Sequence, residues 1–93
     1  MLKFFKTKNL PASVVCACEY DDDLHVTKLA FIGTARDMTA SEAVTPVNLS
    51  IIPDDEWIVV FMNGHVVDGL TSKEAAKSFV RQWYNRAMEA EEI

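Results

Sequence analysis

Two cysteines and two histidines are the residues of this chain best suited to metal or redox chemistry. Cys16 and Cys18 are two residues apart, and His25 and His65 lie further along the chain. Thiolates and imidazoles form tetrahedral zinc sites, but a Cys-x-Cys pair is closer in sequence than the cysteines of a usual zinc knuckle. We therefore expect no bound metal. A metal-binding or minor enzymatic domain built on these four residues remains an alternative, after the two protein-binding hypotheses given below.

The pattern around the two cysteines favours a structural role. In an extended strand, Cys16 and Cys18 share one face with Cα atoms roughly 6.6 Å apart, near the upper limit for a disulfide and poorly directed for one. A bond between them is therefore not expected. Buried thiols behave as small apolar side chains, so we predict that both are core residues of a protein from a reducing compartment.

The sequence offers no recognisable catalytic motif. His25 and His65 each fall on a predicted strand without a neighbouring Ser or Asp motif typical of a triad. The three glycines, at 33, 64 and 69, do not have the spacing of a glycine-rich phosphate loop. Acidic side chains in turns stay solvated and make weak acid–base catalysts. We therefore predict a non-enzymatic protein without a cofactor.

Charge is distributed unevenly along the chain, which has a net charge of −5. Residues 1–18 carry three lysines and no acid, whereas residues 19–68 carry ten acids against Lys28 and Arg36. Residues 69–93 carry four acids and four bases. This acidity argues against direct binding to nucleic acid, whose phosphates reward clustered Lys and Arg, and it permits binding to a basic protein partner.

Two acidic runs, each in a predicted turn, are the candidate partner-binding residues: Asp21, Asp22, Asp23, Asp54, Asp55 and Glu56. The simplest interpretation is that they are solvated charges that keep the protein soluble. The functional hypothesis is a small protein-binding module, an inhibitor or regulator that docks these acids onto a basic, nucleic-acid-handling protein. The alternative is a structural or assembly subunit, with homo-oligomers possible, that associates through a sheet edge or an uncovered sheet face.

The segment from residue 56 to residue 88 contains the clearest signals of local structure. Asn63-Gly64 separates two runs rich in Val, Ile and Phe, which predicts a hairpin of strands Trp57–Met62 and His65–Asp68 joined by a two-residue type I′ turn. Thr71 and Glu74 have the spacing of a helix capping box. The predicted helix after them gathers an apolar stripe and a basic border four residues apart: Ala76, Phe79, Val80, Trp83 and Ala87, with Lys73, Lys77 and Arg81.

The first half of the chain predicts a second hairpin. Ser13–Tyr20 alternates Val14, Cys16, Cys18 and Tyr20 on one face, and Leu24–Gly33 returns after the triple Asp turn. Asp37–Glu42 is predicted as a short helix, capped through Thr39 and Glu42, or as a loop. Alternation at Val47, Leu49 and Ile51 predicts a further strand.

These elements predict an α+β fold in a single domain, residues 1–93. The expected architecture is an antiparallel sheet of four to five strands with the C-terminal amphipathic helix packed on one face. Nowhere do 18 apolar residues follow one another, so we expect no membrane association and a soluble, cytoplasmic protein.

Overall fold

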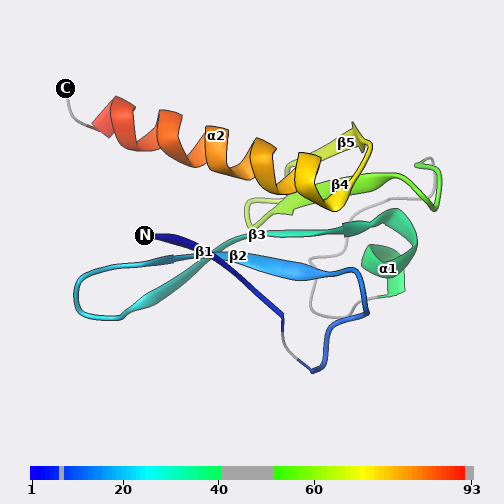
Figure 1. Ribbon diagram of the computed structural model, residues 1–93, viewed down its shortest axis with the longest axis horizontal. Coiled ribbons are helices and arrows are strands. Elements are labelled where there is room, and N and C mark those ends of the chain that lie inside the picture. The colour runs from blue at the N-terminus through cyan, green and yellow to red at the C-terminus, as the bar shows by residue number, and fades with distance from the viewer. Residues whose placement is uncertain (7, 41–51, 92–93) are drawn as a thin grey trace.

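The computed structural model describes residues 1–6, 8–40 and 52–91 of the chain. The elements in chain order are β1 (Leu2–Phe5), β2 (Val15–Tyr20), β3 (Val26–Thr34), α1 (Ala35–Ala40), β4 (Trp57–Phe61), β5 (Val66–Leu70) and α2 (Lys73–Glu91). The strands form one antiparallel sheet in the order β1-β2-β3-β4-β5, and α2 lies across it (Figure 1). The predicted α+β fold with a C-terminal helix packed on an antiparallel sheet is therefore confirmed.

Both faces of the sheet carry buried apolar side chains, because successive residues of a strand point to opposite faces. We call the face under α2 the helix face, with the buried residues Val15, Ala17, Ala30, Ile32, Val59, Phe61, Ala76 and Val80. We call the opposite face the thiol face, with the buried residues Leu10, Val14, Cys16, Cys18, Phe31, Ala35, Met38, Ile58 and Val60. The predicted alternation along β2 is confirmed, and both cysteines are core residues.

The hairpin of β4 and β5 is confirmed, but its turn differs from the expected two-residue type I′ turn. Phe61 N–H donates to the His65 carbonyl at 2.8 Å, and Gly64 N–H donates to the Phe61 carbonyl at 2.9 Å. Gly64 has a φ of 92°, whereas Asn63 does not have a positive φ. The loop therefore has three residues and ends in a left-handed glycine, a common hairpin geometry that requires a positive φ at only one position.

The start of α2 lies one residue later than the predicted capping box. Ser72 Oγ, and not the Thr71 hydroxyl, accepts a hydrogen bond from Ala75 N–H at 3.0 Å. Serine is at least as good an N-cap as threonine, so a shift by one residue costs little. Glu74 remains in the first turn, where the helix dipole favours an acid.

Only the first half of the apolar stripe on α2 is buried. Ala76 and Val80 are fully buried and Phe79 is partly buried, whereas Trp83 is 37% exposed and Ala87 is exposed. The C-terminal end of α2 lies away from the strands (Figure 1), so it has no sheet to pack against. The predicted stripe therefore covers the sheet through Ala76, Phe79 and Val80 but not through its last turns.

The first half of the chain contains two differences from the expectation. Leu2–Phe5 forms β1, although no strand was predicted there. Of the two alternatives for Asp37–Glu42, the structure has a short helix, but it begins at Ala35, and residues 41 and 42 lie outside the described residues. Thr34 Oγ1 caps this helix by accepting from Asp37 N–H at 3.3 Å. Thr39 lies inside α1 and donates to the Ala35 carbonyl, so it is not a cap. The strand predicted at Val47–Ile51 lies outside the described residues.

Candidate interaction surfaces

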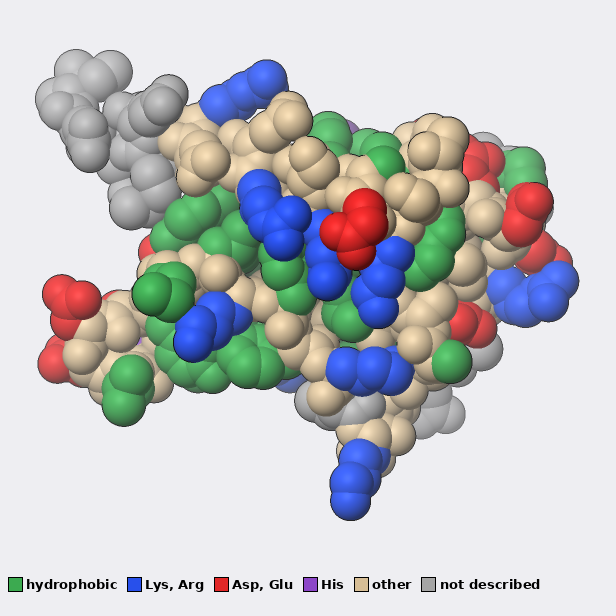
Figure 2. Space-filling model, viewed as in Figure 1, with side chains coloured by type: hydrophobic (Ala, Val, Ile, Leu, Met, Phe, Trp, Pro, Cys, Tyr) green, Lys and Arg blue, Asp and Glu red, His purple; other side chains and the backbone are tan. Residues whose placement is uncertain are grey.

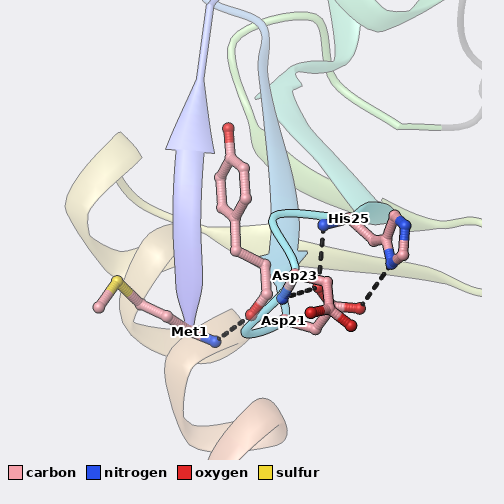
Figure 3. A network of polar contacts seen from close by, with 5 residues as sticks. Met1, Asp21, Asp23 and His25 are labelled. Carbon is pink, nitrogen blue, oxygen red and sulfur yellow. Dashed lines mark hydrogen bonds and ion pairs between the residues drawn. The ribbon is translucent and has the colours of Figure 1, made fainter.

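The first acidic run forms the turn between β2 and β3, at one end of the molecule (Figure 1), and its polar contacts are seen from close by in Figure 3. Asp21 Oδ1 accepts from the backbone N–H groups of Asp23 at 2.9 Å and His25 at 2.8 Å. Asp21 Oδ2 lies 3.1 Å from His25 Nδ1. These contacts, with the His25 N–H first, hold the pKa of Asp21 below its usual value. Asp21 therefore shapes the turn, while Asp22 and Asp23 are exposed.

The same turn also presents apolar surface. Leu24 has a left-handed backbone with φ 63° and is 78% exposed. A bulky side chain in this conformation is rare, because Cβ crowds the following carbonyl. Together with Met1, Lys3, Tyr20, Asp21 and Asp22, Leu24 lines an open hollow of about 420 Å³. The tip is thus mixed in character, with acids beside apolar side chains and one lysine.

The second acidic run precedes β4 and is tied to the start of α1. Ala35 N–H donates to the Glu56 carbonyl at 2.9 Å, and Arg36 N–H donates to the Asp54 carbonyl at 3.2 Å. The exposed Asp54 carboxylate lies 3.8 Å from the Arg36 guanidinium. Asp55 is exposed, whereas Glu56 is half-buried. Part of the negative charge of this run is therefore offset by Arg36.

The two acidic runs lie at opposite ends of the sheet and do not form one surface. The first precedes Val26, the first residue of β3, and the second precedes Trp57, which pairs with Thr34 at the end of β3. Nine residues of strand separate these ends, about 26 Å at the usual rise. Figure 1 shows the β2–β3 turn at one end of the long axis and the start of β4 toward the other. A partner would have to span the sheet to contact both runs.

The structure reveals a different surface along β1, an outer strand of the described sheet. The Met1 nitrogen donates to the Tyr20 carbonyl at 2.7 Å, and Tyr20 N–H donates to the Met1 carbonyl at 2.9 Å. Antiparallel pairing alternates hydrogen-bonded and non-hydrogen-bonded pairs, so Leu2 and Phe4 direct their N–H and C=O groups outward. No described strand pairs with this outer side. It offers a row of backbone donors and acceptors to an added strand.

Basic side chains of α2 lie over this part of the sheet. Lys77 Nζ is 5.4 Å, and Arg81 Cζ 5.2 Å, from the centre of the half-buried Phe4 ring. Tyr84 on the same flank of α2 donates to Glu19 Oε1 at 3.0 Å. Figure 2 shows Lys and Arg side chains gathered along α2 and beneath it, with acidic surface among them in the middle of the view and further acidic side chains toward its two ends. The middle of this face is therefore mainly basic in a protein of net charge −5.

Sequence reasoning found the components of this basic surface but not their combination. The spacing of Lys73, Lys77 and Arg81 places them on one helix flank, and the lysines of residues 1–18 form a separate basic segment of the sequence. The sequence pattern does not predict β1, because a strand of four residues starting at Leu2 is too short to show a clear alternation. The apolar pair Phe4-Phe5 was the available signal, since its two side chains point to opposite faces of the sheet.

The two cysteines and the two histidines do not form a common site. Cys18 Sγ lies 3.5 Å from Cys16 Sγ on the buried thiol face. Burial, followed by the neighbouring Cys18 thiol, raises the pKa of the Cys16 thiol to about 12. His25 and His65 are exposed turn residues and not strand residues as predicted. Within residues 1–6, 8–40 and 52–91, no three His, Cys, Asp or Glu residues are placed to hold a metal ion.

A half-buried polar network joins the segment before β2 to the start of α1. The Asp37 carboxylate accepts from the Ser13 backbone N–H at 3.1 Å and from the Ser13 hydroxyl. Thr34 N–H donates to Ser13 Oγ at 3.2 Å. The Ser13 hydroxyl and then its N–H hold the pKa of Asp37 below its usual value. No described imidazole contacts this network, and its evident effect is to fasten the irregular segment before β2 to the start of α1.

Comparisons with known proteins add no relative: the chain matches no protein-family model, no curated protein and no solved structure. Among the described residues, none of the helices combines the length and apolar character needed to cross a membrane. Functional inference therefore rests on the surfaces described above.

Proposed function

We propose that this protein is a non-enzymatic protein-binding module that associates through the outer edge of β1. The observation that carries the proposal is the outward-facing backbone of Leu2 and Phe4, which no described strand satisfies. An extended segment of a partner gains main-chain hydrogen bonds when it adds to such an edge. This is the edge-pairing form of the assembly hypothesis, which the geometry favours over acidic docking because the two acidic runs lie at opposite ends of the sheet.

The other outer strand is less suited to the same role. The register of β4 and β5 shifts between Trp57 and Val59, and Gly69 in β5 has a φ of 77°. Such a bulge twists an edge away from regular pairing. Association through an uncovered sheet face is also disfavoured, since Cys18, Phe31 and Val60 on the thiol face are at most 4% exposed. The edge of β1 is therefore the better docking element.

A proline at an outward-facing position tests this proposal. Leu2→Pro removes an amide that β2 does not use, so it should block an added strand while the sheet remains intact. Leu2→Ala is the matched control, because it shortens the same side chain and keeps the amide. Partners recovered by mild affinity purification and mass spectrometry should be retained by Leu2→Ala and lost with Leu2→Pro. Equal recovery with a Leu2→Pro protein that is folded by circular dichroism contradicts the proposal.

A second candidate function is docking of the β2–β3 turn onto a basic protein, as an inhibitor or regulator. It is supported by the role of Asp21, which fixes the turn and leaves Asp22 and Asp23 exposed. Exposed charges steer association more than they stabilise a fold. Asp22→Asn with Asp23→Asn should therefore slow association and flatten its salt dependence. Unchanged binding at low and high salt would remove this turn from the mechanism.

A further inference from the structure

Cationic side chains on one flank of α2 lie beside the edge of β1. Phe4 lies on the helix face of β1, and the cations of Lys77 and Arg81 lie within 5.4 Å of its ring centre. Lys73 stands one turn before Lys77 on the same flank. Lys3, between the outward-facing Leu2 and Phe4, is exposed and points to the opposite face, where its Nζ lies 5.6 Å from the Tyr20 ring centre. Asp21 and Asp22 line the same hollow as Lys3, so the helix face of this edge carries the stronger positive charge.

A strand added to β1 would lie roughly 4.8 Å from it, the usual spacing of paired strands. Its side chains on the helix face would stand beside Leu2 and Phe4, within reach of the long Lys77 and Arg81 side chains. Its side chains on the thiol face would stand beside Lys3. Because cross-strand neighbours of opposite charge stabilise pairing and like charges oppose it, acidic residues fit this strand best.

On these grounds, and building on the proposed function, we infer that the partner segment is an extended peptide rich in Asp or Glu. It pairs with the outer edge of β1 and places its carboxylates on the helix face, against Lys77 and Arg81. A second copy of the chain is a poor occupant, because antiparallel pairing of two β1 edges would set Lys3 against Lys3 and bring both α2 flanks together. The net charge of −5 disfavours a nucleic acid, whose long phosphate chain would meet the rest of the molecule.

The test uses two synthetic octapeptides, one alternating Thr and Glu and the other alternating Thr and Lys, with the full chain labelled for NMR. The Glu peptide should shift the amide signals of Leu2 and Phe4 and slow their hydrogen exchange, since those amides become bonded. The Lys peptide should leave these signals unchanged. Binding of the Glu peptide should weaken as salt is added, because its ion pairs are exposed.

Variants then separate the site from general attraction. Lys77→Gln and Arg81→Gln should each weaken binding of the Glu peptide roughly two- to fivefold, the effect of losing one exposed ion pair. Lys28→Gln is the matched control, because Lys28 is exposed and lies opposite Cys18 in the register, away from the α2 flank. It makes the same change in net charge and should alter the affinity by less than about twofold. Thermal unfolding confirms that each variant is folded.

Three results would overturn the inference. The first is Glu-peptide binding that leaves the Leu2 and Phe4 amides unperturbed, which means charge attraction without strand pairing. The second is a loss of affinity for the Glu peptide in Lys28→Gln that equals the loss in Lys77→Gln or Arg81→Gln. The third is binding of a twelve-nucleotide oligothymidylate to the native chain that is tighter than binding of the Glu peptide. If the Glu peptide fails while partners are still lost with Leu2→Pro, the edge-binding function stands and only the acidic chemistry of the partner is wrong.

Discussion

The helix face and the thiol face of the same sheet are covered by different kinds of structure. A single amphipathic helix, α2, covers the helix face through Ala76, Phe79 and Val80. On the thiol face, the described cover comes from the six-residue α1 and from irregular chain around Leu10 and Ile52. The regular cover leaves a sequence signature of period 3.6, whereas the irregular cover leaves none.

This contrast also explains where polar groups are used in packing. The irregular segment before β2 needs a fixed backbone position, which the hydrogen bonds of Ser13 with Thr34 and Asp37 supply beside the thiol face. On the helix face, α2 satisfies its own backbone, and its flank carries cations that contact Phe4. The helix face is therefore covered by regular structure, and the flank of α2 leaves its cations beside the edge of β1.

The largest expected effect is on the rate of alkylation of Cys16, which reports how well the thiol face is shielded from solvent. In the native chain, burial and then the neighbouring Cys18 thiol raise the pKa of the Cys16 thiol to about 12. In Cys18→Ala, burial remains and should keep the Cys16 thiolate rarer than that of an ordinary thiol near pH 8. Alkylation by iodoacetamide should accordingly be much slower in the folded protein than in denaturant. Equal rates would show that the irregular cover opens freely.

Truncation of the helix-face core should be the most destabilising change. Phe61→Ala should cost roughly 3–5 kcal/mol, because Phe61 is buried and contacts the rings of Phe79 and Trp83. Trp83→Ala should cost about 1–2 kcal/mol, since Trp83 is 37% exposed, although the sequence pattern alone predicts 3–5 for it. Urea denaturation measures both values. A Trp83 variant as unstable as the Phe61 variant would mean that α2 packs more closely along its second half.

Gly33 tests the packing density of the thiol face. A Cβ at Gly33 would lie 2.8 Å from Val14 Cγ2 and 3.3 Å from Met38 Sδ, so Gly33→Ala should cost roughly 1–3 kcal/mol through overpacking. Gly64→Ala is the comparison, because its surroundings are open and its cost is backbone strain at φ 92°, about 1 kcal/mol. Thermal unfolding should rank Gly33→Ala as the less stable. The reverse order would indicate that Val14 and Met38 shift readily.

The smallest effect concerns the polar network and its dependence on pH. The pKa of Asp37 is lower in the folded protein than its usual 3.8, so its stabilising contribution is present above about pH 4 and is lost as the pH falls through the folded pKa. Ser13→Ala should cost about 1 kcal/mol near pH 7 and reduce this acid dependence. Denaturation midpoints at pH 7 and pH 3 give both quantities. An unchanged difference between the two pH values would mean that other carboxylates control acid stability.

The sequence alone determined the elements whose signals repeat locally. Alternation assigned Cys16 and Cys18 to one face of β2, and Asn63-Gly64 placed the β4–β5 hairpin, because both depend on neighbouring residues. The helix stripe located α2, but the N-cap fell at Ser72 and burial ended before Ala87. Local patterns fix which residues share a face, and they do not fix how far a helix remains over its sheet.

Tertiary structure alone decided which surfaces the molecule presents. The acidic runs at Asp21–Asp23 and Asp54–Glu56 look alike in sequence, yet the length of β3 separates them at opposite ends of the sheet. Conversely, Phe4 and Arg81 are far apart in the chain, and the sheet order brings them into contact beside an open edge. Charge composition is a property of the sequence, whereas a charged surface requires the long-range strand pairing that only the folded chain provides.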